Sequence, residues 1–390
     1  MPTEHCRNAR VLIAGISTRA AVESACRAGF DVTSIDAFAD LDQPNSARAL
    51  SLARDFGAPY SARNAARAAS TIDCDAVVYL SNFENHPRSV ATLTAGRALW
   101  GNTPDVLRRV RNPLRLSRTL ESRGFKTPRV SLDAPGDPCG RDIEWLIKPR
   151  ASGGGHGVRS WRPAGAVPRR CYLQQRIDGQ AGSVVFVAAR GRALVLGFSR
   201  LLVGDAVFGV SGYRYCGNIL ASAEDDSFLR HRTESLSALA TAMAEEFGLV
   251  GVNAIDFVAH DGVPYVIEVN PRWSASMELI ERSYGLSIFA AHASACMDGE
   301  LPDFEPARTQ QCRGVLGKAV VFARRDVVLG NPSGWLKDED IRDVPRPGER
   351  IAAGHPICTV FATGETVEGC RETLRVRAAG IHAELDHFST

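Results

Sequence analysis

Asp256, Glu268, Asn270 and Arg272 are the residues of this 390-residue chain whose types and spacing most clearly indicate chemistry. Glu268 and Asn270 are two residues apart at the end of a strand predicted over residues 264–269, so their side chains leave the same face. Asp256 lies on the preceding partner strand. Two carboxylates and a carboxamide are the hard oxygen ligands that Mg²⁺ prefers, and Arg272 would place a fixed cation beside the metal. The pattern suits a metal–phosphate site, and the alternative of an ordinary solvated strand face stays open on residue chemistry alone.

The register of this hairpin decides whether the two carboxylates can share a metal ion. A two-residue turn at residues 261–262 would place Glu268 opposite Ile255, whereas a three-residue connection at 261–263 places it opposite Asp256. Two bare carboxylates that close would repel each other, so this second register requires a cation between them. We therefore predict an odd-length turn or a bulge, with Mg²⁺ bridging Asp256 and Glu268.

Lys148 is the second-to-last residue of a strand predicted over residues 143–149, and the glycine-rich segment 150–157 follows this strand. Glycines let backbone N–H groups turn toward phosphate oxygens without Cβ clashes. The chain has only four lysines among its 46 basic residues, so a lysine inside an apolar strand favours a specific role. A compact ammonium fits between phosphate oxygens where a planar guanidinium does not. The segment therefore predicts a phosphate-binding loop, with a plain hairpin loop as the alternative.

The elements that must position these residues follow from the hydrophobic pattern. The first part of the chain predicts strands over residues 10–14, 31–35 and 76–80 and helices over 18–28 and 47–56. This alternation indicates a parallel sheet with helices on both faces. The middle predicts helices over 105–123, 226–247 and 286–296, strands over 183–189 and 193–198, and the hairpin at 251–272. The segment 301–390 predicts a smaller β-rich unit with strands over 317–323, 341–344 and 356–361.

Two loops are predicted to contact substrate. Residues 81–86 follow a strand, where open α/β sheets place ligand loops. Residues 203–217 are rich in glycine and aromatic residues, and with residues 150–157 they predict a lid that closes over ligands. Lys318 either reaches the site or is a surface lysine on its strand.

Composition excludes several classes of protein. The formal net charge is +2, with 46 basic and 44 acidic residues, which supports neither a nucleic-acid nor a membrane surface. No apolar run reaches the length of a membrane span, and residues 1–15 lack the pattern of a signal peptide. The ten cysteines are scattered without metal-binding spacing, which predicts free thiols. We expect a cytoplasmic protein that binds neither nucleic acid nor membrane.

Two motifs resemble those of the ATP-grasp superfamily. IEVNPRWSASMELIE, residues 267–281, resembles the metal-binding strand of that family, which carries E-x-N-P-R or a close variant. WLIKPRASGGGHGV, residues 145–158, resembles its strand–Lys–Pro followed by a glycine-rich loop. The motifs occur in the family's order. The resemblance implies an α/β protein with a Rossmann-like N-terminal domain (1–100), an ATP-grasp α+β fold (101–300) and a small β-rich C-terminal segment (301–390).

The resemblance also implies ATP with Mg²⁺, or alternatively Mn²⁺, and assigns residues by position. Asp256, Glu268 and Asn270 would be the metal ligands, and Lys148 and Arg272 the catalytic cations. The nucleotide-binding residues would be Lys148, Ser152, Gly153, Gly154, Gly155, Gly157, Gln174, Gln175, Ile177 and Gln180. Two positions depart from the family pattern. Arg111 or Arg115 stands where many members have a phosphate-binding Lys, and Ala181 stands at the usual acidic ribose position, with Gln180 as a substitute.

The resemblance implies a reaction in which ATP activates a carboxylate as an acyl-phosphate, which then reacts with an amine. Both substrates would be small molecules. A homodimer is one expected assembly. The runs NPRWSASMELIE and GKAVVFARRD are most similar to predicted carboligases of the superfamily. Similar proteins accompany methanopterin and methanofuran pathways, so a glutamyl or amino-acid ligase of cofactor biosynthesis is the finer expectation. Two alternatives stay open: an ATP-binding regulatory protein that has lost catalysis, and a carboxylase-type subunit that activates bicarbonate.

Overall fold

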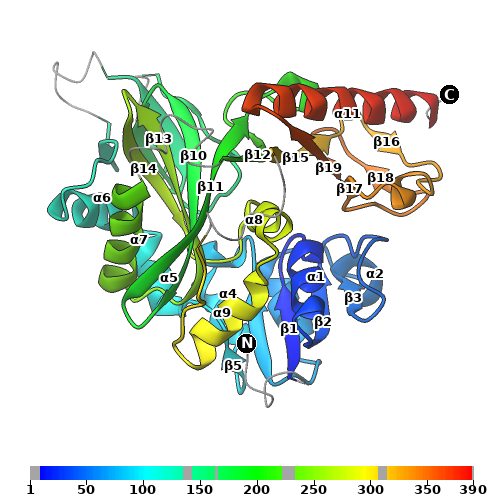
Figure 1. Cartoon of the computed structure of the whole chain (residues 1–390), viewed down its shortest axis with the longest axis horizontal. Helices are drawn as coiled ribbons and strands as arrows, with labels where there is room; N and C mark the ends of the chain where they lie inside the picture. The colour runs from blue at the N-terminus through cyan, green and yellow to red at the C-terminus, as the bar shows by residue number, and fades with distance from the viewer. Residues whose placement is uncertain (1–8, 135–142, 163–165, 222–232, 306–313, 389–390) are drawn as a thin grey trace.

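The computed structural model describes residues 9–134, 143–162, 166–221, 233–305 and 314–388 (Figure 1). The described residues form a parallel sheet, a large antiparallel sheet, a small four-stranded sheet and a two-stranded ribbon. No helix in these ranges is both long enough and apolar enough to cross a membrane. The cysteines that the structure describes are all free thiols, as expected.

The N-terminal sheet is parallel, with strand order β3-β2-β1-β4-β5. Its strands are β1 (Arg10–Ala14), β2 (Asp31–Asp36), β3 (Arg48–Ser51), β4 (Ala76–Tyr79) and β5 (Ala98–Leu99), and its helices are α1 (Arg19–Arg27), α2 (Leu52–Phe56), α3 (Ala62–Ala69) and α4 (Pro87–Leu93). Val11 and Ile13 pack on the α1 side, whereas Leu12 and Ala14 pack on the α3 side. Helices therefore cover both faces, as predicted.

One N-terminal prediction is wrong. Residues 47–56 were expected to form a helix, but Arg48–Ser51 pairs in parallel with β2 and only Leu52–Phe56 is helical. The edge of the sheet offers hydrogen-bond partners that outweigh the local helical preference of these residues.

The helical segment predicted over residues 105–123 is two helices, α5 (Pro104–Val110) and α6 (Pro113–Ser122). Pro113 has no N–H to continue a helix and disfavours helical geometry at the residue before it. Asn112 instead caps α6, because its side-chain oxygen accepts hydrogen bonds from the backbone N–H groups of Leu114 and Arg115. The break leaves Arg111 at the end of α5, where it turns toward the site described below.

The four-stranded sheet has the order β6-β9-β7-β8 and carries the glycine-rich loop. Its strands are β6 (Val130–Ser131), β7 (Trp145–Pro149), β8 (Arg159–Ser160) and β9 (Cys171–Gln175). The loop connects β7 to β8, so Lys148 leads directly into it, as the sequence indicates.

The large sheet has the order β14-β13-β10-β11-β12-β15-β19-β17, with every neighbouring pair antiparallel. Its strands are β10 (Gln180–Ala189), β11 (Arg192–Val203), β12 (Tyr215–Ala221), β13 (Gly251–His260), β14 (Val263–Asn270), β15 (Val315–Phe322), β17 (Ile341–Arg342) and β19 (Pro356–Gly364). The associated helices are α7 (Thr233–Phe247), α8 (Met277–Tyr284) and α9 (Ile288–Met297). Residues 226–232 of the helix predicted at 226–247 lie outside the described residues.

The C-terminal segment extends this large sheet rather than forming a sheet apart, because β15 pairs with β12. A 22-residue helix, α11 (Val367–Phe388), follows β19 and covers these strands (Figure 1). The expectation of a β-rich segment missed this helix. Its buried apolar residues are Val367, Cys370, Leu374, Ala378, Ile381 and Leu385. They recur at helical spacing, so the signal was present in the sequence. The two-stranded ribbon pairs β16 (Val327–Val328) with β18 (Arg350–Ile351).

Candidate active site

The hairpin of β13 and β14 brings Asp256 and Glu268 face to face. The turn is the two-residue Asp261-Gly262, and both residues have positive φ (48° and 74°) as a type I′ turn requires. The preferred three-residue connection is therefore wrong. The register instead shifts between Phe257 and Asp256, so that Ile267 is left as a bulge. A bulge was the second of the two predicted possibilities, and it places Glu268 opposite Asp256.

Burial and neighbouring charge give the two carboxylates different acidities. Burial, together with the nearby Glu268 carboxylate, raises the pKa of Asp256 to about 6. Burial would also raise the pKa of Glu268, but the neighbouring cations, first of all Arg111, outweigh it and lower that pKa. Asn270 lies with them, because its Nδ2 donates to Asp256 Oδ2 at 2.8 Å. A divalent cation between the carboxylates would favour the ionised form of both.

This donor set fits a metal ion that is shared with a phosphate-bearing ligand. In the described part of the chain, no group of three or more His, Cys, Asp or Glu residues is placed to hold a metal ion. Asp256, Glu268 and Asn270 supply oxygen atoms from two carboxylates and one amide. Such a set suits Mg²⁺, which is usually bound through one or two carboxylates, substrate phosphates and water.

Arg272 is fixed beside these residues by a buried carboxylate. Its Nη2 donates to Glu84 Oε1 at 2.8 Å and to Asn270 Oδ1 at 3.1 Å, while Nη1 donates to the Trp273 carbonyl oxygen at 2.9 Å. The Glu84 side chain is completely buried. Glu84 belongs to the predicted substrate loop 81–86, but its contact with Arg272 was not predicted. The available signal was a carboxylate in a loop that follows a β-strand.

Arg111, and not Arg115, points at the site. Arg111 Nη1 donates to Glu268 Oε1 at 2.6 Å, and Nη2 donates to Asn85 Oδ1 at 2.9 Å and to the Ser152 carbonyl oxygen at 3.2 Å. Arg115 is exposed on α6. Arg111 therefore links the metal hairpin, the loop after β4 and the glycine-rich loop.

Lys148 contacts the side chain of Gln174 on the neighbouring strand β9. Lys148 Nζ donates to Gln174 Oε1 at 3.0 Å, and Gln174 Nε2 donates to the carbonyl oxygen of the bulged Ile267 at 3.3 Å. The pair thus connects the phosphate-loop strand to the metal hairpin. Gln175 lines the same cavity, but its side-chain oxygen accepts from the Arg129 backbone N–H at 3.3 Å.

The glycine-rich loop packs against the predicted lid. The Tyr215 backbone N–H donates to the Gly154 carbonyl oxygen at 3.1 Å. A Cβ atom on Gly155, which has φ of 72°, would lie 1.8 Å from the Tyr213 carbonyl oxygen. Only glycine allows this close approach, so the loop 150–157 and the segment 203–217 meet directly in this conformation.

These residues line one cavity of about 550 Å³, which is within the usual range for small-molecule sites. Of the predicted site residues, those that line it are Lys148, Ser152, Gly153, Gly154, Gly155, Gln174, Gln175, Ile177, Asp256, Glu268, Asn270 and Arg272. Gly157 and Gln180 do not line it, and the Gln180 side chain is exposed and donates to the Ala181 carbonyl oxygen. Sequence reasoning missed three further lining residues, Arg19, Glu278 and Asp343, whereas the lining residue Tyr215 belongs to the predicted lid 203–217.

Comparison with known proteins identifies the domain that carries this site. Residues 110–276 match the family model of the ATP-grasp domain. An uncharacterized protein of Methanocaldococcus jannaschii is 24% identical over 375 residues, which cover 91% of this chain and 88% of that relative.

Two solved structures share the fold over nearly the whole chain. L-amino acid ligase from Bacillus licheniformis superposes with a TM-score of 0.66 at 16% identity, covering 98% of each chain. Pyruvate carboxylase from Rhizobium etli superposes with a TM-score of 0.72 at 15% identity over 95% of this chain, which spans 37% of that longer chain. At such identities the likeness establishes the fold. The domain match shows that residues 110–276 are an ATP-grasp domain, and the superpositions show that the fold of these two structures is shared over nearly the whole chain.

Proposed function

We propose that this protein is an ATP-dependent ligase that activates a small-molecule carboxylate and joins it to an amine, releasing ADP and phosphate. The observation that carries this proposal is the facing pair Asp256 and Glu268 in the cavity that also contains Lys148 and Arg272. Buried carboxylates beside fixed cations suit a metal-bound phosphate chain better than an apolar ligand.

The reaction divides into two displacements. First, a carboxylate oxygen of the substrate attacks the γ-phosphorus of ATP; the bond from phosphorus to the bridging oxygen breaks, and ADP leaves. Second, the amine nitrogen attacks the carbonyl carbon of the acyl-phosphate. The bond between that carbon and the phosphate oxygen breaks, phosphate leaves, and the nitrogen loses a proton to give the amide.

The residues of this chain would act mainly by position and charge. Asp256, Glu268 and Asn270 would hold Mg²⁺, which when bound neutralises phosphate charge. Lys148 would contact the phosphates from β7. Arg272, held by Glu84, would stabilise negative charge on the transferring group without having to reorganise, because its guanidinium is already fixed.

The finer proposal is an amino-acid or glutamyl ligase of cofactor biosynthesis of the methanopterin or methanofuran type. The shared fold with an L-amino acid ligase supports an amino-acid substrate. The shared fold with pyruvate carboxylase favours a second candidate, a subunit that activates bicarbonate.

An ADP-release screen distinguishes these candidates. Purified protein with ATP and Mg²⁺ is offered carboxylates, including amino acids and pterin or furan precursors, with and without amines, and bicarbonate in a separate arm. We expect ADP release that requires both a carboxylate and an amine, with an amide product identified by mass. Arg272→Met is the inactive control, with its fold checked by thermal melting.

The other outcomes contradict the proposal in different ways. ADP release with bicarbonate alone would favour the carboxylase candidate. ATP binding without ADP release in any arm would instead support a regulatory ATP-binding protein.

A further inference from the structure

Lys318 lies on β15 at the far side of the large sheet from the metal hairpin, and it lines the same cavity. Only 5% of the residue is exposed. Among the residues that the structure describes, its ammonium has one hydrogen-bond partner, Glu278 Oε2, at 2.7 Å. An ammonium carries three N–H donors, so two donors remain for a ligand in the cavity. The alternative of a surface lysine is excluded by this burial.

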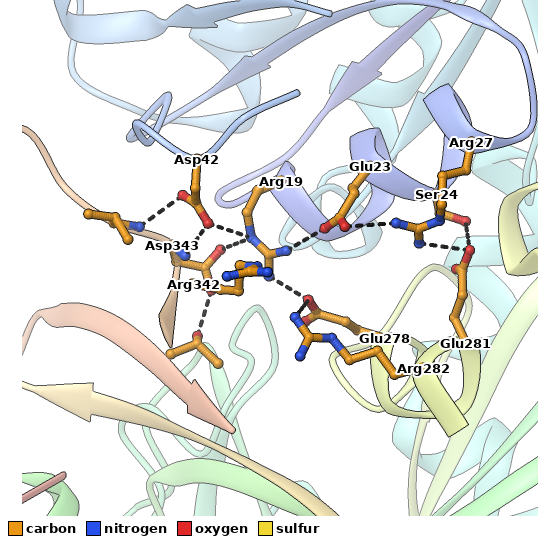
Figure 2. Close-up of polar contacts among 12 residues, drawn as sticks. Arg19, Glu23, Ser24, Arg27, Asp42, Glu278, Glu281, Arg282, Arg342 and Asp343 are labelled. Carbon is orange, nitrogen blue, oxygen red and sulfur yellow. Dashed lines mark hydrogen bonds and ion pairs between the residues drawn. The ribbon is translucent and has the colours of Figure 1, made fainter. Parts of the chain in front are cut away.

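Glu278 is held in place by cations on three sides. Arg19 Nη2 donates to Glu278 Oε1 at 2.7 Å, and Arg282 Nη2 lies 3.9 Å from the same oxygen (Figure 2). Burial would raise the pKa of Glu278, but Arg19, Lys318 and Arg282 outweigh it and lower that pKa strongly. Glu278 is therefore ionised, and it fixes the Lys318 ammonium through this ion pair.

Arg19 anchors this group to the rest of the molecule. It is 1% exposed, and it also donates from Nε to Asp343 Oδ1 at 2.8 Å and from Nη1 to Glu23 Oε2 at 2.9 Å (Figure 2). Arg19 belongs to the N-terminal domain, Glu278 to α8 and Asp343 to the segment after β17. Three parts of the chain thus fix the position of the Lys318–Glu278 pair.

The strand order separates Lys318 from the predicted nucleotide contacts. Four strand steps lead from β13, which carries Asp256, through β10, β11 and β12 to β15. At the usual spacing of about 4.8 Å per step, this is at most about 19 Å along the sheet. The predicted phosphate contacts lie on β7 and its loop. Lys318 therefore enters the cavity from a different sheet from Lys148 and from a different strand from the predicted metal ligands.

We propose that Lys318 binds a carboxylate of the organic substrate that is not the reacting carboxylate, so that the amine acceptor is an amino acid or short peptide. This inference rests on the proposed ligase function and names the class of its acceptor. The acceptor's amine would lie toward Arg272 and Asn270, and its free carboxylate would accept hydrogen bonds from Lys318. A plain amine would leave the buried ammonium donors without a partner.

The test compares acceptors that differ only in this carboxylate. ADP release is measured at saturating ATP, Mg²⁺ and activated carboxylate, with glycine, β-alanine, γ-aminobutyrate and glycylglycine as acceptors. Each is compared with a primary amine of the same length without the carboxylate. We expect kcat/KM to be about 10- to 100-fold higher for the carboxylate-bearing acceptors, because a charge-assisted hydrogen bond is gained.

Variants locate the effect at Lys318. Lys318→Met should raise KM for the carboxylate-bearing acceptors by about tenfold or more and leave KM for ATP and for the plain amines unchanged, while Lys318→Arg should restore part of the preference. Exposed Lys337→Met is the matched control and should change nothing. Lys318→Met alone leaves Glu278 without its ammonium partner. If that variant does not fold, the double variant Lys318→Met with Glu278→Gln removes both charges of the pair, and the same KM values are measured on it.

The outcomes separate this inference from the ligase function. Equal kcat/KM for both kinds of acceptor in the unmodified protein, or an equal effect of Lys318→Met on both, overturns the role of Lys318 and leaves the ligase function intact. No ADP release with any acceptor overturns both.

Discussion

Asp256 faces Glu268 only because Ile267 is a bulge in the pairing of β13 with β14, on the turn side of Glu268. With the observed two-residue turn, an unbroken ladder would place Glu268 opposite Ile255 and turn the two carboxylates to opposite faces. The carbonyl oxygen of the same bulged residue accepts a hydrogen bond from Gln174, the partner of Lys148. One irregularity in the strand thus assembles the proposed metal ligands and ties them to the proposed phosphate-binding lysine.

Glu268→Gln should weaken Mg²⁺-dependent nucleotide binding. The change removes a negative charge and a metal-binding oxygen with little change in volume. We therefore expect weaker ATP binding in the presence of Mg²⁺ and a fall in ligase activity on the order of 100-fold. Calorimetric titration of ATP with and without Mg²⁺ measures the effect. Substitution of the exposed Glu246 on α7 by Gln is the matched control. If Mg²⁺ enhanced ATP binding equally in both variants, Glu268 would not be a ligand.

Lys148→Ala should weaken ATP binding by about 10- to 100-fold, because a charge-assisted phosphate contact is lost. Lys337→Ala, which removes an exposed lysine, should leave the ATP dissociation constant unchanged. Small and equal effects of the two substitutions on measured ATP affinity would remove Lys148 from the site.

Gly155→Ala should open the contact between the glycine-rich loop and the lid. Its Cβ would meet the Tyr213 carbonyl oxygen at 1.8 Å, whereas a Cβ on Gly154 meets nothing within 4 Å. Both glycines have positive φ, so Gly154→Ala controls for backbone strain.

Hydrogen exchange measures this contact. Adding a non-hydrolysable ATP analogue, Mg²⁺ and substrate should slow exchange in both segments, 150–157 and 203–217, in the unmodified protein and in Gly154→Ala. The protection should be largely lost in Gly155→Ala. Exchange that ligands leave unchanged in the unmodified protein would contradict the lid interpretation.

The sequence predicted the side chains of the site better than it predicted the turn and the long-range contacts that position them. Asp256, Glu268, Asn270, Arg272 and Lys148 meet in one cavity, because the motifs fix their strands and strand periodicity fixes their faces. The turn was wrong because the choice between a longer loop and a bulge depends on tertiary contacts such as the Gln174 hydrogen bond to Ile267. Local preference cannot supply that contact.

The ion pairs between residues far apart in the sequence could not be predicted for a similar reason. Glu84 and Arg272 are 188 residues apart, and Arg19 and Glu278 are 259 apart, so no local pattern connects them. The burial of Lys318 follows from the pairing of β15 with β12, which the expectation of a separate C-terminal segment did not include. By contrast, the break before α6 followed from Pro113 and could have been read from the sequence.

His292 should make stability depend on pH below neutrality. Its Nδ1 accepts the Val252 N–H at 3.0 Å, and burial lowers its pKa to about 4. Because the folded-state pKa lies below the unfolded value of about 6.5, the stabilisation is complete above pH 6.5 and is lost as the pH falls toward 4. The expected loss of unfolding free energy is about 3 kcal/mol.

Chemical denaturation from pH 7 to pH 4 measures this slope. His292→Gln should flatten this slope, whereas His260→Gln, at the half-exposed end of β13, should retain it. A slope that is the same in both variants would show that His292 does not titrate as described.

Isotope transfer tests whether the protein activates a carboxylate through an acyl-phosphate. The carboxylate found by the ADP-release screen is labelled with ¹⁸O in both oxygens and turned over with ATP and its amine, and the released phosphate is examined by ³¹P NMR. If an acyl-phosphate forms, one ¹⁸O atom should appear in each phosphate and one ADP should form per amide. Unlabelled phosphate, or AMP and pyrophosphate as products, would contradict it.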